Sequence, residues 1–389
     1  MALAWLVLQL TGSAAAMGLV LTAQLVPTLA LLLLGGAAAD RWAKLPMMVA
    51  SDGVRAGVVA VVALLIAMGV VALPHLLLLG VVFGFVDAVF MPAWAALLPE
   101  IVPVEDRSSA NALASLGARL AGIAGPAVGA VLVAAGGTAV AFAVDGVSFA
   151  LSGALLAGLW VVQRRHGAGV TTPTTVASAE TPAATSSRAG LLADIREGLA
   201  AVIATPWIGL TIAAAAITNI SLAGPLESSV PLLVQRSMGG GVGVLGLYES
   251  AVAAGAIVAA IVLGSRKRLR RRWRLVYGWW IAVALAAAAM GLSIGIAGLL
   301  VAALVVGAGE AVVGLAWTNA LQDHVADDLL GRVYSLDYLG SAALIPVGYL
   351  VAGVASDAVG PSAVFLVGGL VSAAILAVIA VLPQIRRLD

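Results

Sequence analysis

Long runs of apolar residues recur along the whole chain, and they limit its fold more than any other feature. Residues 47–71, 206–233 and 297–320 are three of these runs, and each is long enough for a helix to cross about 30 Å of hydrocarbon. Of the 389 residues, 62% are hydrophobic and 10% are charged, whereas a soluble domain is about 25% charged. Because lipid offers the backbone no hydrogen bonds, such runs form helices. The sequence therefore predicts an all-α polytopic membrane protein.

One apolar stretch occurs twice, at residues 82–100 and again at residues 305–323, and the two copies align without a gap. Matches among alanines and valines mean little in this chain, but acids and tryptophans are scarce. The informative matches are Gly84 with Gly307, Asp87 with Glu310, Trp94 with Trp317, and Glu100 with Asp323. This repeat predicts two pseudo-symmetric halves, each with an acid near the middle of the membrane.

The matched acids carry the functional prediction, because a charged group at the centre of a bilayer is costly and usually has a role. Asp87 lies about 18 Å into the predicted helix 75–98. Arg119 lies at a similar depth in the predicted helix 108–135, so a pairing of these two side chains would stabilise both. Trp94 and Trp317 each follow their acid by seven residues, which places each pair on one helix face.

A polar linker separates two sets of predicted spans. The spans are residues 1–9, 14–36, 47–71, 75–98, 108–135, 139–162, 206–233, 244–264, 275–293, 297–320, 333–355 and 362–382. We therefore expect a six-helix bundle over 1–162, a cytoplasmic linker over 163–205 and a second six-helix bundle over 206–389. Residues 171–187 contain Thr, Ala, Ser and Pro without periodicity, which predicts disorder in the linker. The first span reaches only about 14 Å, so we expect a truncated first helix whose in-frame start lies about 15–30 residues upstream.

Basic residues are distributed unevenly between the two sides of the membrane. If residue 14 lies outside, Arg236 alone among the 20 Lys and Arg residues falls on an outside loop. Seven basic residues lie within residues 266–274, where they would anchor the topology against anionic lipid rather than bind nucleic acid. This asymmetry predicts that both termini of the complete protein lie in the cytoplasm and that the two halves are parallel repeats.

Residues 36–45, G-A-A-A-D-R-W-A-K-L, form a predicted polar turn between the second and third spans. Gly36, Asp40, Arg41 and Lys44 resemble the loop 2–3 signature of the major facilitator superfamily, although positions 43 and 45 depart from it. The resemblance implies that Asp40 caps the N-terminal end of helix 11, near residues 332–333, where an anion is favoured. The alternative is a solvated turn whose charges only fix the topology.

A second motif lies in the predicted fifth span. Gly125 and Pro126, in A-G-I-A-G-P-A-V-G-A, are similar to the helix 5 motif of antiporters in the same superfamily, and V-D-G-V-S-F at 144–149 is similar to its exporters. Small residues allow close helix contact and proline allows a bend, so simple tight packing is the alternative. Within the superfamily, the chain is most similar to bacterial exporters of the enterobactin and macrolide type.

This resemblance implies a monomeric transporter in the bacterial cytoplasmic (inner) membrane that exports a drug-like or siderophore-like solute by proton antiport. A carboxyl group held away from water can carry a proton near neutral pH. The predicted proton or substrate sites are Asp87, Glu310, Arg119, Trp94, Trp317, Glu249 and Glu227, and the predicted gating residues are Gly36, Asp40, Arg41, Lys44, Gly125 and Pro126. The alternatives are structural pairing for the acids and anchoring at the membrane interface for the tryptophans.

No enzyme, cofactor, metal site or nucleic-acid partner is expected. The chain has no cysteine, and its three histidines, His75, His166 and His324, are scattered. No nucleophile–base pair or phosphate-binding loop is found. Two other functions are compatible with the pattern. One is a transporter of lysophospholipid on the same fold, and the other is a membrane scaffold that transports nothing.

Overall fold

The computed structural model describes residues 1–167, 197, 199, 200, 202–264, 271–292 and 294–388. It leaves undescribed the side chains of residues 32–41, 108, 119, 165–167, 327, 328, 387 and 388. Within the described ranges, every regular element is a helix, and ten helices are long and apolar enough to cross a membrane. The prediction of an all-α multi-pass membrane protein is confirmed.

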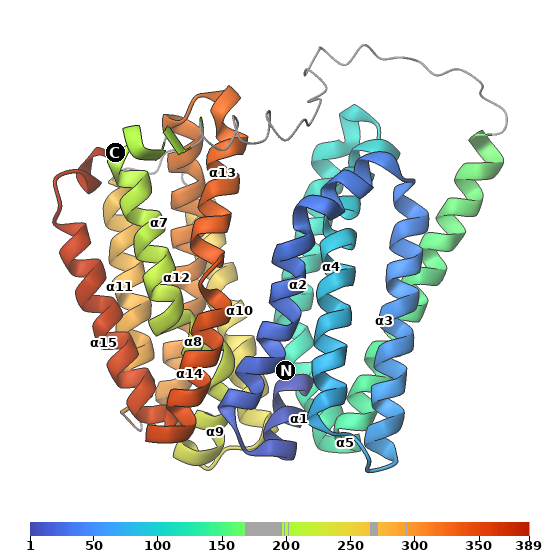
Figure 1. The fold of residues 1–389 in the computed structure, drawn as a ribbon, viewed down its shortest axis with the longest axis horizontal. Helices are drawn as coiled ribbons and strands as arrows, with labels where there is room; N and C mark the ends of the chain where they lie inside the picture. The colour runs from blue at the N-terminus through green and yellow to red at the C-terminus, as the bar shows by residue number, and fades with distance from the viewer. Residues whose placement is uncertain (168–196, 198, 201, 265–270, 293, 389) are drawn as a thin grey trace.

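The first half consists of helices that run back and forth along one axis (Figure 1). Its elements are α1 (Ala2–Thr11), α2 (Ala14–Arg41), α3 (Lys44–Ala67), α4 (Leu73–Ile101), the 3-10 turn η1 (Val104–Asp106) and α5 (Arg107–Gly167). Helix α2 continues to Arg41, past residue 36 where the sequence predicted a turn. Residues 37–39 are all alanine, the residue with the highest helix propensity, so the chain leaves the helix only at residues 42 and 43.

Helix α5 contains a reversal of the chain. It is 61 residues long, but Gly137 has φ 77° and ψ 175°, which is not helical. A positive φ is accessible to glycine because it has no Cβ atom. Residues 107–136 and 138–167 therefore form two antiparallel arms (Figure 1), which correspond to the spans predicted at 108–135 and 139–162.

The second half is built in the same way from shorter pieces. Its elements are α7 (Pro206–Thr218), the π-helical turn η2 (Asn219–Ala223), α8 (Gly224–Ser228), α9 (Val230–Met238), α10 (Val242–Gly264), α11 (Arg272–Met290), α12 (Gly295–His324), α13 (Asp327–Ala342), α14 (Ile345–Val359), α15 (Pro361–Ala380) and the 3-10 turn η3 (Ile385–Leu388).

Two spans that the sequence predicted as continuous helices are divided. The span at 206–233 is interrupted by η2 and again at Ser229, and the span at 333–355 is interrupted between α13 and α14. Pro225 and Pro346 stand in the first turns of α8 and α14. Proline lacks a backbone N–H and is tolerated best in a first turn, where that N–H would have no helical partner. The prolines therefore mark where each new helix begins.

The sequence repeat is visible in the packing of two helix pairs. Gly84 of α4 lies against the backbone carbonyl of Gln24 on α2, and Gly307 of α12 lies against the carbonyl of Val252 on α10. A Cβ atom at either glycine would collide with that carbonyl, and small residues are what allow helix backbones to approach so closely. Equivalent glycines thus support equivalent helix contacts in the two halves, while the domain limits stay a prediction.

The two halves touch mainly along two helix pairs, α2 with α14 and α5 with α10, with smaller contacts of α2 with α8 and of α1 with α9. The hydroxyl of Thr22 donates to the carbonyl of Pro346 at 3.2 Å, and the hydroxyl of Ser250 donates to the carbonyl of Ile123 at 3.1 Å. Figure 1 shows α1, α9 and the adjoining ends of α2 and α14 gathered at the lower end, whereas the ribbons of α4 and α13 stand apart at the upper end. We call the lower end, where α2 begins and α14 ends, the contact end.

Candidate coupling and substrate site

A buried arginine in the first half binds two carboxylates. The guanidinium of Arg55 on α3 donates to Oδ1 of Asp52 at 3.3 Å and also to Oδ1 of Asp87 on α4. The hydroxyl of Ser152 donates to the second oxygen of Asp52 at 2.6 Å, and the amide of Gln24 donates to the second oxygen of Asp87 at 3.3 Å. One cation therefore faces two anions, and two neutral donors complete the cluster.

Helix periodicity and aromatic packing hold this charge cluster in place. Asp52 and Arg55 are three residues apart, so both project from one face of α3. The guanidinium carbon of Arg55 lies 4.4 Å from the ring centre of Phe90 and 5.6 Å from that of Phe149, and a ring face attracts a cation. Asp52 and Arg55 were not among the predicted site residues. The signal for them in the sequence was two opposite charges three residues apart inside an apolar run.

The sequence predicts Arg119 as a partner of Asp87. The side chain of Arg119 lies outside the described residues, so that pairing stays a prediction. Arg55, which the sequence analysis did not assign to the site, is the cation that contacts Asp87 among the described side chains.

The two carboxylates of the cluster differ in their access to solvent. The side chain of Asp52 is 2% exposed, whereas that of Asp87 is 27% exposed. Asp87 opens onto a cavity of about 260 Å³ that Tyr349 of α14 also lines. The remaining lining residues are Leu21, Gln24, Leu25 and Thr28 of α2. Asp87 therefore lies at the boundary between the two halves and is partly open to this cavity.

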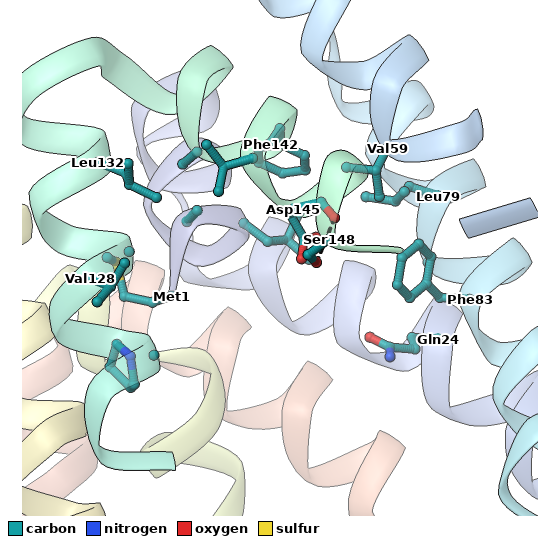
Figure 2. A pocket seen from close by; sticks show the side chains of 18 residues that line it. Met1, Gln24, Val59, Leu79, Phe83, Val128, Leu132, Phe142, Asp145 and Ser148 are labelled. Atoms are coloured by element: carbon teal, nitrogen blue, oxygen red, sulfur yellow. Dashed lines mark hydrogen bonds between the residues drawn. The ribbon is translucent and has the colours of Figure 1, made fainter. Parts of the chain in front are cut away.

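A larger cavity of about 740 Å³ lies inside the first half (Figure 2). Its wall is mostly apolar, with Phe83, Phe142 and Leu132 among the labelled side chains. The polar groups come from Gln24, Asp145 and Ser148. This size and lining are typical of sites for small molecules. Because Gln24 lines this cavity as well as the one at Asp87, the two spaces share one polar side chain.

The second half places its acids without a comparable cation. Glu310 of α12 lines a cavity of about 290 Å³ together with Asn219 and Trp280. Glu227 of α8 and Glu249 of α10 lie close enough to Glu310 for mutual Coulomb repulsion. In the described part of the chain, no arginine or lysine forms an ion pair with any of these three acids. Among the described side chains, the two halves therefore share an acid at equivalent positions, but only the acid of the first half has a basic partner.

The two matched tryptophans have different surroundings. The indole N–H of Trp317 donates to Oδ2 of Asp337 on α13 at 2.9 Å, and its ring meets that of Trp207 edge to face, with centres 5.6 Å apart. Trp94 is 46% exposed. Asp337 in turn accepts from the hydroxyl of Ser341 at 3.5 Å. Trp317 thus makes its contacts within its own half. For Trp94 and Trp317 alike, stacking on a solute stays a prediction.

The predicted gating residues are only partly described. The side chains of Gly36, Asp40 and Arg41 lie outside the described residues, so the proposed cap on helix 11 stays a prediction. Lys44, at the start of α3, forms an ion pair with Glu100 near the end of α4 at 3.0 Å. This contact joins two helices of the same half.

Gly125 and Pro126, the other predicted gating residues, lie on the first arm of α5. Both line the larger cavity in the first half. The carbonyl of Pro126 also lies against Gly246 of α10, where an added Cβ would meet it at 3.1 Å. Pro126 therefore lies where α5 packs against α10 of the second half, and the gating role of both residues stays a prediction.

Comparison with protein families gives one match, to the family model described as Major Facilitator Superfamily, over residues 1–343. No curated protein matches the chain in sequence.

Solved structures resemble the whole fold. A bacterial homologue of the iron transporter ferroportin, in an inward-facing state, is 15% identical, with a TM-score of 0.68 over 98% of this chain and 93% of that chain. A bacterial homologue of the human lysosomal transporter Spinster, inward-facing and unoccupied, is 16% identical, with a TM-score of 0.65 over 97% and 89%. The nucleoside transporter NupG is 12% identical, with a TM-score of 0.63 over 97% and 92%. At these identities the likeness concerns the fold alone.

Proposed function

The chain belongs to the major facilitator superfamily, and we propose that it exports a small hydrophobic or amphipathic solute in exchange for protons. Membership of this family makes it a membrane transporter of a small molecule rather than an enzyme. The export direction, the proton coupling and the solute class extend the resemblance to enterobactin and macrolide exporters. The proposed setting is the bacterial cytoplasmic membrane, with both termini of the complete protein inside, the contact end outside and the protein acting as a monomer among membrane lipids.

The carboxylate of Asp87 carries this proposal, because it is bound by Arg55 on one side and open to a cavity on the other. While Asp87 is ionised, its attraction to Arg55 ties α4 to α3. When Asp87 accepts a proton, that attraction is lost, and Arg55 stays paired with the fully buried Asp52. A proton at Asp87 thus changes the charge of the cavity by one unit without leaving Arg55 unpaired.

The position of Asp87 links this proton to the movement of the halves. Tyr349 of α14 lines the same cavity, and α14 packs against α2. In alternating access, one half rocks against the other around a central site. A change of charge at Asp87 therefore occurs in a cavity that is lined by both helices of the pair that must separate.

The acids of the second half supply a site for positive charge. Glu310 is exposed in its cavity, and Glu227 is exposed at the end of α8. Because no described cation pairs with them, these carboxylates favour a proton or the cationic part of a solute. Each proton that enters down the membrane potential releases about 2.3 kcal/mol per 100 mV. In an antiporter this free energy can drive the solute outward.

The test is transport in proteoliposomes with an imposed pH gradient and a panel of amphipathic fluorescent dyes. Asp87→Asn and Glu310→Gln should each reduce gradient-driven export at least about tenfold, since removing one coupling carboxylate removes one proton site. Glu105→Gln, in the exposed turn η1, is the matched control and should export like the wild type.

Unchanged export in both cavity variants would remove these acids from the mechanism. Transport of labelled lysophospholipid that continues after an uncoupler is added, with no dye export, would favour the lipid-transporter alternative instead.

A further inference from the structure

A carboxylate of the second half caps the first turn of a helix in the first half. Asp357, near the end of α14, accepts hydrogen bonds from the hydroxyl of Ser13 at 2.5 Å, from the backbone N–H of Ala14 at 2.8 Å and from that of Ala15 at 3.1 Å. The first N–H groups of a helix have no partner within the helix, and a negative charge is favoured there. Asp357 therefore caps the first turn of α2 together with Ser13, whose hydroxyl accepts a hydrogen bond from the backbone N–H of Ala16 at 3.1 Å.

A second contact holds the same turn. Gly12 ends α1 with a φ of 60°, and its carbonyl accepts a hydrogen bond from the guanidinium of Arg236 on α9 at 3.0 Å. Asp357 and Arg236 are also close enough to attract one another. Two elements of the second half thus bind the single turn between α1 and α2, α14 through the negative Asp357 and α9 through the positive Arg236.

Helices α2 and α14 then stay in backbone contact from this turn to the middle of the bundle. Gly353 lies against Ala15, whose Cα would be 2.7 Å from an added Cβ, and Gly18 lies against the carbonyl of Tyr349. The hydroxyl of Thr22 bonds to the carbonyl of Pro346 one turn further. This contact between α2 and α14 ends at the cavity of Asp87, which Tyr349 lines. The cap therefore lies at one end of this helix contact, and the cavity at Asp87 lies at the other.

We propose that Asp357 is a gating residue of the transport cycle. Its cap on α2 holds the contact end closed, and the cap must break when the halves separate there. This inference rests on the proposed alternating access. It assigns to Asp357 a role that the sequence analysis did not give it, and it acts at the opposite end of the bundle from the predicted cytoplasmic turn at residues 36–45.

The hydrogen bonds predict which state a variant favours. Opening the contact end breaks three hydrogen bonds to a carboxylate, and bonds to charged groups are the stronger ones. Asp357→Asn removes the charge and one acceptor while keeping the shape. The population with an open contact end should rise about tenfold, which corresponds to losing one charge-assisted bond.

The experiment measures distances between spin labels in the full chain, which has no cysteine of its own. The pair Val70→Cys and Leu292→Cys reports on the contact end, because these residues lie in exposed turns between α3 and α4 and between α11 and α12. The pair Val104→Cys and Gln322→Cys reports on the other end. In Asp357→Asn, the distance distribution of the pair at the contact end should gain a longer component. That of the pair at the other end should gain a shorter component.

Two further variants keep the test decisive. Ser13→Ala removes one of the three bonds to Asp357, and with it the bond that the Ser13 hydroxyl accepts from Ala16 within α2. It leaves the two backbone bonds to Asp357 in place, so it should shift both distances in the same direction by less, even if Asp357→Asn folds poorly. Ser362→Ala removes a hydroxyl–hydroxyl bond of 2.8 Å to Ser237 at the same end but within one half, and it should shift neither.

Distance distributions that stay as in the wild type in both Asp357→Asn and Ser13→Ala would overturn the gating role. So would a shift of equal size in Ser362→Ala. The measurement needs no solute, so a failure of dye export in the wild type would refute the proposed function separately and leave the distance result standing.

Discussion

Arg55→Met should destabilise the protein more than any other removal of a single charge in the first half, because it leaves Asp52 buried without a counter-charge. Arg55 is 5% exposed and the Asp52 side chain is 2% exposed. At an effective dielectric constant of about 20, opposite charges 3.3 Å apart attract by about 5 kcal/mol. Removing one partner of a buried pair costs about 3–5 kcal/mol, and we expect a loss of that size in the free energy of unfolding.

A second substitution shows which carboxylate causes the loss. Asp52→Asn added to Arg55→Met removes the buried charge, so it should restore most of the lost stability. Asp87→Asn added to Arg55→Met should restore less, because the Asp87 side chain is 27% exposed and can be hydrated when Arg55 is gone. The difference in unfolding free energy between the two double variants therefore reports how much more strongly Asp52 is buried than Asp87.

The assay is reversible unfolding by SDS in mixed micelles, followed by the fluorescence of the nine tryptophans. Arg164→Met is the matched control, because Arg164 is an exposed cation that lies 4.2 Å from the ring centre of Trp160, a contact worth about 0.5–1 kcal/mol. The reasoning is refuted if Arg55→Met costs no more than this control, or if Asp87→Asn restores more stability than Asp52→Asn.

Two more substitutions test the packing of the bundle. Gly84→Ala should lower the free energy of unfolding by about 1–3 kcal/mol, because its Cβ would collide with a backbone carbonyl. Gly117→Ala, at a helical glycine with open space around it, should be neutral or slightly stabilising in the same SDS titration. Trp317→Phe removes the N–H that donates to Asp337 and should cost about 1–3 kcal/mol. A Trp317→Phe protein as stable as the wild type would show that this bond contributes nothing.

The sequence was sufficient for the class of protein and for its internal repeat. Apolar runs long enough to span lipid can only be helices, and Gly84 and Gly307 do occupy equivalent helix contacts. It was also sufficient to single out Asp87, because a carboxylate inside an apolar span needs a partner whatever the tertiary structure is. The interruptions of the helix within the spans 206–233 and 333–355 were less predictable. Prolines at 225 and 346 permit such breaks but do not require them.

Only the tertiary structure decided which side chains meet. Depth in the membrane did not reveal Arg55, which lies on the neighbouring helix α3 and is the cation beside Asp87 among the described side chains, while the pairing with Arg119 stays a prediction. Asp357 likewise caps a helix that begins 343 residues earlier in the chain. A span made of Ala, Val, Leu and Gly is apolar on every side, so its hydrophobic pattern does not reveal which face meets which helix. In lipid that choice is made by close packing at small residues and by a few polar contacts, and these exist only once the helices are assembled.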